Sequence, residues 1–448
     1  MITILGAGLA GLSCAFHLGH ERCILFERNS YAGGHIYSHH RDGFIWDEGP
    51  HVSFTKHAYV RELFEESVER QLLEYPVQVG NYYQGAWIPH PAQSNLYAVP
   101  EPLRSRCLED FLTIRNSEAP GKPSANYAEW LQQAFGETFA TTFPTVYTRK
   151  YWTREPRDLA TDWVGERVFY PDVEIVQKGF RGPPSQTTHY VNTVRYPSRG
   201  GYIRFAKKLE HGANIQFEHQ ITRIDLKERE IFFANGKQHR YERLINTLPL
   251  PEFIRIASDV PADVRQAAAT LCCSRLLLVN VTANHAARQP YHWLYVYDED
   301  KLSTRINHIE LLSPDNAPTG KTGLQVEVYD SRYRPFPADQ AAIAKIIVAE
   351  LLEMGLIEQP ESVHTRMIPY ANVIFDHERR DAQDQVLKWL TQYGLEREAD
   401  DLEPMTQWTQ TTNLNTGWLT LAGRFAQWKY YWTDDCVLRG RALIDAST

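Results

Sequence analysis

The spacing of glycines near the start of the chain constrains its fold more than any other feature. Gly6, Gly8 and Gly11 follow residues 2–5, a short apolar run with β-branched side chains that is typical of a buried parallel strand. Helix-forming apolar residues then continue to Leu18. We therefore expect a strand, a tight turn and a helix whose N-terminus presents unpaired N–H groups and a positive dipole end to a phosphate group.

A second predicted strand, residues 23–26, ends in the acidic residue Glu27. In a dinucleotide-binding unit, an acid at this place accepts hydrogen bonds from the adenosine ribose, while the three glycines serve the turn, the close approach to the pyrophosphate and the packing of helix on strand. The carboxylate also repels a 2′-phosphate, which argues against NADP in this site. Strand, glycines, helix, second strand and acid together predict a bound dinucleotide.

Paired glycines follow at Gly33 and Gly34, where an NAD-binding chain normally begins another helix. This segment resembles the extended fingerprint of the amine oxidase and protoporphyrinogen oxidase flavoprotein superfamily. The resemblance implies that the cofactor is FAD, that the paired glycines pass close to its diphosphate, and that Arg28 contributes to the same site. It implies an α/β fold, in which a Rossmann-like, glutathione-reductase-type FAD-binding domain is interleaved with a mixed sheet-and-helix substrate domain.

Composition narrows the class of protein. Charged residues make up 23% of the 448 residues and hydrophobic ones 43%, which is typical of a soluble globular protein. The net charge of −8 and the lack of a basic block argue against a nucleic acid partner, and no apolar run is long enough for a membrane span. The first predicted strand leaves no room for a signal peptide, and the six scattered cysteines favour a cytoplasmic protein. No histidine has a ligand partner at metal spacing, so we expect no metal site.

The order of predicted elements indicates two interleaved domains. We assign residues 1–75, 190–250 and 405–448 to a discontinuous FAD-binding domain, and residues 76–189 and 251–404 to a substrate-binding domain. The pair Asn235-Gly236 predicts a hairpin before a strand that returns to the nucleotide domain. Near the other end of the chain, Gly423 and Arg424 follow an apolar strand and precede a helix, which predicts a second phosphate- or flavin-facing N-terminus.

Several segments, in the same order along the chain, resemble the UDP-galactopyranose mutases. They are "PTVYTRKYWTREPRDLATDWVGERV", "YPSRGGYIRFAKKLE", "GPHVSFT", "STRINHIELL" and "AGRFAQWKYYW". In that family the reduced flavin attacks the anomeric carbon of a nucleotide sugar, displaces the nucleotide diphosphate, and lets the sugar ring reclose in the other size without net oxidation. The resemblance therefore implies a nucleotide sugar as the small-molecule substrate.

The same resemblance suggests roles for particular residues. A departing diphosphate requires a fixed arginine fork and phenolic donors. Arg305 is the first choice for the fork, with Tyr329 and Tyr430 as donors and His51 on the flavin side. The substrate-binding residues that the resemblance implies are Tyr147, Lys150, Trp152 and Arg167, with Trp152 stacking on the nucleotide base.

The chain departs from the mutase pattern at several positions. Glu166 occupies the place of the family's arginine, with Arg167 one residue further on, and Asn307 and Trp432 replace other family residues. Three hypotheses therefore stay open: a reduced-flavin mutase, a flavin oxidase or dehydrogenase that takes a hydride from a small molecule, and a non-catalytic FAD-binding scaffold. We expect FAD to be bound without a covalent link, with NAD(P)H from solution as a candidate reductant and a homodimer as a candidate assembly.

Overall fold

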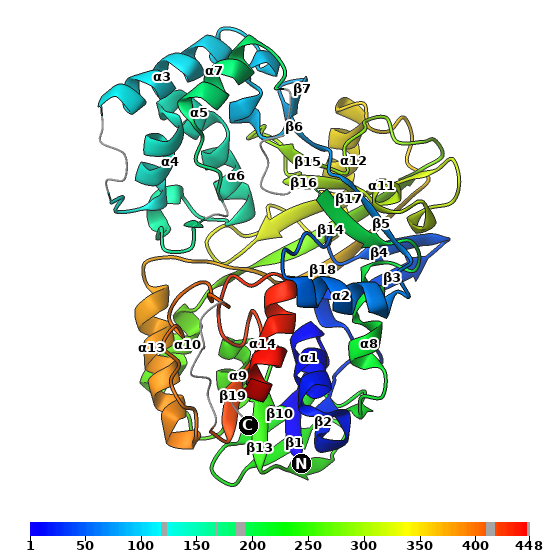
Figure 1. The fold of residues 1–448 in the computed structure, drawn as a ribbon, viewed down its shortest axis with the longest axis vertical. Helices are drawn as coiled ribbons and strands as arrows, with labels where there is room; N and C mark the ends of the chain where they lie inside the picture. Colours follow the sequence, from blue (N-terminus) through cyan, green and yellow to red (C-terminus); the bar gives the residue numbers. More distant parts are fainter. Residues whose placement is uncertain (118–122, 166–167, 185–192, 409–416, 446–448) are drawn as a thin grey trace.

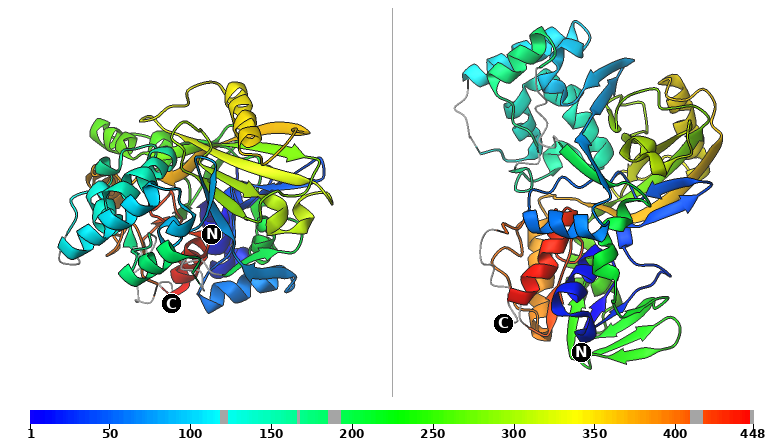
Figure 2. Two further views of the ribbon diagram at one scale, coloured as in Figure 1. Left: turned by 90° about the horizontal axis from the view of Figure 1, so that it is seen from above. Right: turned by 45° about the vertical axis from the view of Figure 1, so that its right-hand side comes forward.

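The computed structural model describes residues 1–448 except 118–122, 166–167, 185–192, 409–416 and 446–448. The molecule is elongated, with both termini in the part at the bottom of Figure 1 and a long mixed sheet across its middle. The two further views in Figure 2 show the same division into a part that holds the termini and a part that does not. Many of the site residues predicted from the sequence lie where these parts meet.

A five-stranded parallel sheet forms the part with the termini. Its strand order is β19 (Leu419–Leu421), β13 (Arg243–Asn246), β1 (Ile2–Leu5), β2 (Cys23–Phe26) and β9 (Ile215–Gln216). The central strand β1 is buried along its whole length, as a strand with neighbours on both edges and layers on both faces must be. The predicted strand–turn–helix unit is confirmed, because α1 (Leu9–Leu18) follows β1 and leads to β2. The expected return of the chain at β13 is confirmed as well.

Helices and a small sheet surround this parallel sheet. The close approach of α1 to α14 (Thr433–Asp445) depends on Gly440, because a Cβ there would lie 2.3 Å from the hydroxyl of Ser13. The other elements in this part are α2 (Ala58–Ser67), α8 (Lys207–Glu210), α9 (Leu250–Ile256), α10 (Ala262–Thr270), α13 (Arg379–Leu390) and the sheet of β10 (Ile221–Asp225), β11 (Glu230–Phe233) and β12 (Gln238–Arg240). The hairpin predicted at Asn235-Gly236 is confirmed by the antiparallel pairing of β11 with β12.

A seven-stranded mixed sheet crosses the middle of the molecule (Figure 1). Its strand order is β18 (Ser362–Val373), β14 (Cys273–Ala283), β17 (Thr322–Asp330), β16 (Arg305–His308), β15 (Trp293–Val296), β6 (Val79–Tyr83) and β7 (Ala86–Pro89). Helix α12 (Gln340–Glu353) covers one face, where the aliphatic side chains of β14, β16 and β17 form a buried cluster. The opposite face carries larger polar and aromatic side chains and faces the cavity described below.

Smaller elements connect the two sheets. They are β3 (Ser38–Arg41) with β4 (Phe44–Asp47), β5 (Leu72–Pro76) with β8 (Thr193–Pro197), and α11 (Ile309–Leu312). The segment after β4 contributes residues 48–52 to the lining of the cavity described below.

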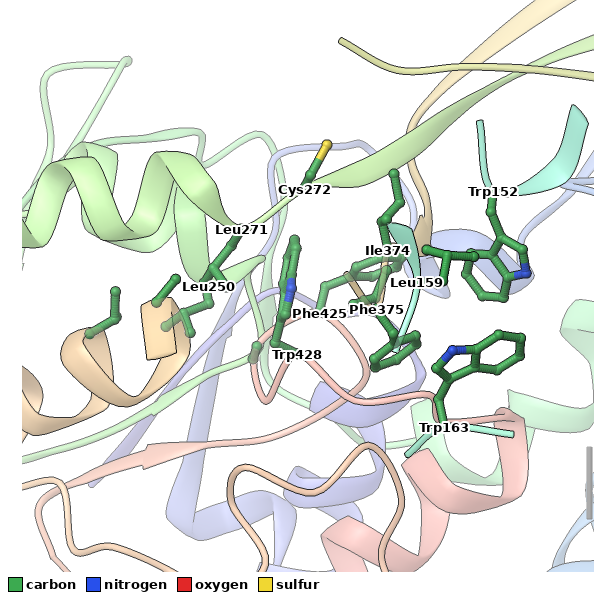
Figure 3. Packing of buried hydrophobic residues seen from close by; sticks show 14 of the residues in the cluster. Trp152, Leu159, Trp163, Leu250, Leu271, Cys272, Ile374, Phe375, Phe425 and Trp428 are labelled. Atoms are coloured by element: carbon green, nitrogen blue, oxygen red, sulfur yellow. The ribbon is translucent and has the colours of Figure 1, made fainter. Parts of the chain in front are cut away.

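A group of helices forms the remaining part of the molecule, at the upper left of Figure 1. Its members are α3 (Leu103–Ser117), α4 (Tyr127–Phe135), α5 (Glu137–Thr142), α6 (Pro144–Tyr151) and α7 (Val173–Arg181). Aromatic packing joins this group to the rest of the chain. Figure 3 shows Trp152, just after α6, close to Trp163 and Phe375, and the ring centres of the two tryptophans are 5.1 Å apart.

The boundaries of the two domains stay a prediction. Helices α9, α10 and α13 follow residue 250 in the sequence but lie in the part with the termini in Figure 1. Helix α9 contacts β10 of the small sheet, and α10 contacts α13.

Candidate functional site

A cavity of about 940 Å³ lies where the two parts of the molecule meet. One end is formed by the glycine turns of the parallel sheet, the middle by residues 48–52, and the far end by the seven-stranded sheet and the helical group. The cavity is lined by these site residues predicted from the sequence: Gly6, Gly8, Glu27, Arg28, Gly33, Gly34, His51, Tyr147, Trp152, Arg305, Tyr329, Gly423, Arg424 and Tyr430.

The N-terminus of α1 faces this cavity. Its N-cap residue is Gly8, whose lack of a side chain leaves the first N–H groups of the helix without a side-chain cap, and Leu9 and Ala10 line the cavity. A Cβ on Gly34 would lie 3.0 Å from the Cα of Gly8, and Gly33 donates its N–H to the Ala7 carbonyl at 2.8 Å. The two glycine turns therefore form one smooth backbone surface that suits a diphosphate.

Gly6 and Gly11 shape this turn in different ways. Gly6 has a φ of +94°, which L side chains rarely adopt. A Cβ on Gly11 would lie 2.1 Å from the Gly6 carbonyl oxygen, so Gly11 lets the helix lie directly on the turn. Gly11 does not line the cavity, and its role is to pack α1 against β1 rather than to contact a ligand.

Glu27 stands at the end of the cavity next to β2. Its side chain is buried, and its two carboxylate oxygens accept the N–H groups of Ala7 and Asn29, each at 2.9 Å. These two hydrogen bonds hold the Glu27 carboxylate between the turn that follows β1 and the segment that follows β2. Arg28 follows it along the same wall.

The C-terminal segment contributes Gly423 and Arg424. The Arg424 guanidinium donates from Nη2 to the Asn372 side-chain oxygen at 2.8 Å and from Nη1 to the Tyr431 carbonyl at 3.3 Å. Its Nε is buried without a hydrogen-bond partner. The helix expected directly after this pair begins only at Thr433, because an irregular segment intervenes, but Thr433 also lines the cavity.

These features fit an adenine dinucleotide with a flavin. The uncapped helix N-terminus and the backbone of the glycine turns suit the diphosphate, Glu27 suits the ribose, and the unpartnered Nε of Arg424 is a donor that a ligand could use. The residues that the structure describes contain no group of three or more His, Cys, Asp or Glu side chains that could hold a metal ion.

Strand register builds the wall of the cavity formed by the seven-stranded sheet. Glu327 on β17 lies opposite Arg305 on β16 and Leu278 on β14, Leu278 lies opposite Arg366 on β18, and Arg305 lies opposite Tyr295 on β15. Since residues directly opposite each other point to the same face, these five side chains form one row across the sheet.

Arg305 and Glu327 form a bidentate ion pair in this row. The guanidinium Nε and Nη2 each lie 2.7 Å from a carboxylate oxygen, and the Tyr329 hydroxyl donates to the same carboxylate at 2.8 Å. Burial alone lowers the pKa of Arg305, but the facing carboxylate more than offsets this and holds that pKa well above its usual range. Both hydrogen bonds to Glu327 come from Nε and Nη2, so Nη1 of Arg305 does not take part in this ion pair.

His51 lies in the segment that follows β4. Its Nδ1 is 3.0 Å from the Gly49 carbonyl oxygen, which can only accept, so Nδ1 carries the proton. Burial lowers the pKa of His51 to about 4. The ring is therefore neutral at ordinary pH, and Nε2 is left as a hydrogen-bond acceptor.

Tyrosines dominate the far end of the cavity. Tyr147 and Tyr151 are stacked on α6, with ring centres 5.3 Å apart, and Tyr295 meets Tyr147 edge-on at 5.2 Å. Burial raises the pKa of each of these three phenols. They are therefore neutral hydrogen-bond donors. Tyr430 lies nearby, with its ring 5.6 Å from that of Trp152.

The remaining predicted substrate residues differ in their placement. Trp152 lines the cavity but is 4% exposed, with its ring against Trp163 and Tyr430. Lys150 does not line the cavity: its buried ammonium donates to the Val296 and Asp298 carbonyls, each at 3.1 Å. Arg167 lies outside the described residues.

Sequence reasoning did not single out Glu327, Glu48, His35 or Arg366, all of which line the cavity. Glu327 could have been found from its spacing, because a residue two positions before Tyr329 on a strand shares its face. Its pairing with Arg305 could not, because it depends on the register of β16 with β17. His35 directly follows the paired glycines, so its place near the glycine turns could have been predicted from the sequence. Nothing in the sequence predicted its hydrogen-bond partners.

Solved structures share this fold over the full chain. A reduced UDP-galactopyranose mutase matches with a TM-score of 0.87 and 23% identity, over 100% of this chain and 95% of that one. A protoporphyrinogen oxidase candidate from Exiguobacterium sp. 255-15 matches with a TM-score of 0.70 and 16% identity, over 100% of this chain and 98% of the other. Together with the observed sheets, these likenesses confirm the predicted fold class.

Curated relatives match shorter stretches. A protoporphyrinogen oxidase 2 from Arabidopsis thaliana is 23% identical over 191 residues, which cover 40% of this chain and 37% of the relative. A 4,4'-diapophytoene desaturase from Staphylococcus haemolyticus is 39% identical over 72 residues, which cover 15% of this chain and 14% of the relative. The matched stretches thus span well under half the length of either relative.

The family comparison covers nearly the whole chain. The model described as flavin-containing amine oxidoreductase matches residues 9–440. In the part of the chain that the structure describes, no helix is both long and apolar enough to cross a membrane. The backbone surface formed by Gly6, Gly8, Gly33 and Gly34, which we call the glycine cradle, and the buried acid Glu27 agree with this match. The chain belongs to the flavin-containing amine oxidoreductase family, as the superfamily resemblance indicated.

Proposed function

We propose that this flavoenzyme binds FAD without a covalent link and acts on a nucleotide sugar while the flavin is reduced, interconverting the pyranose and furanose rings or catalysing a related reaction. One observation carries the proposal. The cavity that begins at the glycine cradle ends at Arg305, which Glu327 fixes by two hydrogen bonds, with phenols around it. This end of the cavity combines an oriented cation with neutral donors, the groups that a departing diphosphate requires.

The residues of the cavity support separate roles in such a reaction. Reduced flavin would supply a nucleophilic nitrogen for the sugar. Arg305, fixed along one edge, would donate from Nη1 to the diphosphate, and Tyr329 would hold Glu327 so that the guanidinium cannot rotate. The phenol of Tyr430 would donate to the same charge, while the buried phenols of Tyr147 and Tyr295 exclude water around it.

The cofactor and the nucleotide would occupy opposite ends of the cavity. Gly8, Gly33, Gly34 and Arg424 would hold the FAD diphosphate, and Glu27 its ribose. Tyr147 and Trp152 would contact the nucleotide of the substrate, to which Arg167 is a further candidate contact. The hydrogen bonds that the Lys150 ammonium donates to the carbonyls of Val296 and Asp298 favour a structural role for Lys150.

A second candidate function rests on a different observation. The helical group and the segment after it contribute uncharged aromatic side chains to the lining: Tyr127 and Phe135 on α4, Phe139 on α5, and Trp163. A desolvated apolar site suits hydride transfer to a flavin, so an oxidoreductase of the amine oxidase or protoporphyrinogen oxidase type is the alternative. NAD(P)H as external reductant, a homodimer and a cytoplasmic location also remain proposals.

The test separates the two reactions. The purified yellow protein is reduced anaerobically with dithionite and incubated with a panel of UDP- and dTDP-sugars, and the products are separated by anion-exchange chromatography. Ring-contracted or ring-expanded nucleotide sugar without flavin reoxidation supports the mutase proposal. Flavin reduction by an amine or another C–H donor, followed by peroxide formation in air, supports the alternative and contradicts the mutase.

Arg305→Ala sharpens this test. If Arg305 holds the leaving diphosphate, we expect a loss of about 3 kcal/mol in transition-state stabilisation, measured as kcat/KM on the active sugar nucleotide. Arg240→Ala is the matched control, because Arg240 pairs with Glu230 on the surface hairpin and its side chain is 74% exposed. Near-normal turnover of Arg305→Ala would remove this residue from the site.

A further inference from the structure

Asn372, near the end of β18, takes no part in the proposed reaction but connects the two ends of the cavity. Its side-chain oxygen Oδ1 accepts two hydrogen bonds, one from Nη2 of Arg424 at 2.8 Å and one from the Tyr151 hydroxyl at 2.9 Å. Arg424 follows β19 of the parallel sheet, and Tyr151 ends α6 of the helical group. Asn372 therefore joins the two parts of the molecule inside the cavity, which it also lines.

The orientation of the Asn372 amide follows from these partners. A guanidinium N–H can only donate, so the amide atom that faces Arg424 is the oxygen. The two donors occupy both lone pairs of Oδ1, and Nδ2 with its two N–H groups lies on the other side of the amide. Among the described residues, none accepts a hydrogen bond from Nδ2, although only 4% of Asn372 is exposed. Nδ2 is therefore the atom of Asn372 that is left for a ligand in the cavity.

The polar side chain opposite Asn372 in the sheet does not satisfy this donor. Ser274 lies directly opposite Asn372 on β14, and its hydroxyl is buried, yet the two side chains form no hydrogen bond. The pairing of β14 with β18 is irregular just beyond this pair, between Ser274 and Leu276. A buried N–H group without a partner is costly, so a donor in this position is normally satisfied by a ligand or by water.

The strand order of the parallel sheet indicates which half of the cofactor lies at Asn372. Glu27 follows β2, the glycine turn follows β1 and Arg424 follows β19, so the order β19-β13-β1-β2 places Glu27 and Arg424 on opposite sides of the turn. A dinucleotide whose adenosine ribose meets Glu27 and whose diphosphate crosses the turn therefore has its flavin half on the side of Arg424. Asn372 is one hydrogen bond further along, toward Tyr151.

We propose that Asn372 binds the flavin half of FAD by donating a hydrogen bond from Nδ2 to an oxygen or nitrogen acceptor of the ribityl chain or the ring. The partners of Oδ1 are themselves held in place. Arg424 also donates to the Tyr431 carbonyl, and the Tyr151 ring meets that of Tyr329 edge-on, with centres 4.9 Å apart. The amide is thus oriented before the cofactor binds. This inference rests on the proposed FAD site but not on the proposed reaction with a nucleotide sugar.

The test compares FAD with ADP, which carries the adenosine and the diphosphate but no flavin. Both are titrated into the full-length apoprotein, and isothermal titration calorimetry measures their dissociation constants. Asn372→Leu replaces the amide with an apolar side chain of similar size. We expect this variant to raise the Kd for FAD about tenfold, the effect of losing one hydrogen bond, and to keep the Kd for ADP within about twofold of the wild-type value.

Two further variants control the result. Asn372→Asp keeps an oxygen for Arg424 and Tyr151 but lacks the N–H donor, so it should not restore FAD affinity. Ser274→Ala alters the side chain opposite and should bind FAD as the wild type does. Equal losses of FAD and ADP affinity in Asn372→Leu would overturn the proposal, because Asn372 would then act on the diphosphate through Arg424. Wild-type FAD affinity in Asn372→Leu or Asn372→Asp would also overturn it.

A measurement on the unaltered chain covers the case in which the variants fail to fold. In NMR spectra of protein labelled with ¹⁵N-asparagine, the side-chain N–H signals of Asn372 should move when FAD is added and stay in place when ADP is added. Signals that FAD leaves unchanged would refute this inference alone, whereas a wild-type chain that binds no FAD would overturn both this inference and the proposed cofactor. No sugar nucleotide enters these experiments, so their outcome is independent of whether the proposed mutase reaction is found.

Discussion

The two walls of the cavity are specified by the chain in opposite ways. The cradle wall comes mainly from one continuous stretch, Gly6 to Gly34, in which each glycine and Glu27 has a fixed distance along the sequence from the next. The sheet wall brings together Tyr295, Arg305, Glu327 and Arg366 from four strands, through the register of their pairing. Local spacing therefore determines the cradle wall, to which we assign the cofactor, and tertiary register determines the sheet wall, to which we assign the substrate.

This difference has an energetic counterpart. The cradle depends on backbone shape and on hydrogen bonds from N–H groups, which tolerate an empty site because water can replace the ligand. The sheet wall contains a buried ion pair, whose partners depend on each other. Substitutions in the sheet wall should therefore affect folding, whereas substitutions in the cradle should affect flavin retention.

The largest expected effect is on the sheet wall. Arg305→Ala leaves the Glu327 carboxylate buried without its guanidinium, and we expect the free energy of unfolding to fall by about 3–5 kcal/mol. Urea denaturation followed by tryptophan fluorescence measures it. The exposed pair of Arg240 and Glu230 is the comparison, and Arg240→Ala should cost under about 1 kcal/mol. Equal losses of unfolding free energy in Arg305→Ala and Arg240→Ala would mean that the pair of Arg305 and Glu327 stabilises the fold no more than an exposed ion pair does.

The next effect depends on pH. Burial lowers the pKa of His51, in the segment after β4, and of His308, at the end of β16, from 6.5 to about 4. Between these values the unfolded chain binds protons that the folded chain does not. The free energy of unfolding should therefore fall as pH drops from 6.5 to about 4, by at most about 1.4 kcal/mol per pH unit for each histidine.

His308→Gln should remove the share of this slope that belongs to His308, which lies opposite Leu324 on the face of the sheet turned away from the cavity, and leave the share of His51. Urea midpoints measured across the acidic range provide the comparison. A variant whose stability falls as steeply with acid as that of the wild type would show that folding does not lower the pKa of His308.

A smaller effect is expected for the acid of the cradle. Glu27→Ala removes an acceptor for the ribose, and hydrogen bonds to a charged group are worth about 1.5–3 kcal/mol. We expect FAD affinity to fall by that amount, seen as flavin loss during dialysis and measured by fluorescence titration of the apoprotein. Unchanged retention would contradict the assignment of Glu27 to the ribose.

The smallest effect compares two glycines. Gly11→Ala places a Cβ 2.1 Å from the Gly6 carbonyl oxygen, an overlap that we expect to cost roughly 1–3 kcal/mol of unfolding free energy. Gly236→Ala, in the hairpin, meets no atom within 4 Å and has only the penalty of its φ of +80°. Thermal unfolding and flavin absorbance should show lost flavin in Gly11→Ala alone. Flavin loss in both would argue against a local role of the glycine turn.

The sequence predicted the cradle well because its determinants are local. The strand–turn–helix–strand unit needs only the order of apolar residues, glycines and an acid, and all of these lie within the first 27 residues. The alternation of side chains along β17 also explains why Glu327 and Tyr329 line the same cavity. Neither inference requires knowledge of which strands are neighbours.

The sheet wall was harder to predict for the same physical reason. The partner of Arg305 is Glu327, and no spacing in the sequence reveals that β16 pairs with β17 in that register. Lys150 shows the opposite case, because the resemblance implied a substrate contact for a residue that does not line the cavity. It lies on α6 beside Tyr147, but its long side chain turns to the carbonyls of residues 296 and 298 at the end of β15. The resemblance identified the position of Lys150 in the sequence, but the packing of α6 against β15 determines where its side chain points.

The strand order of the parallel sheet has a consequence for synthesis. β1 is flanked by β13, and β13 by β19, which begins at residue 419. At about 5–20 residues per second, a ribosome needs roughly 20–80 seconds between making the first strand and the last. Strand β1 gains β2 and then β13 as neighbours during this interval, but the other edge of β13 stays open until β19 is synthesised. The parallel sheet can therefore be completed only after residue 421 has been made.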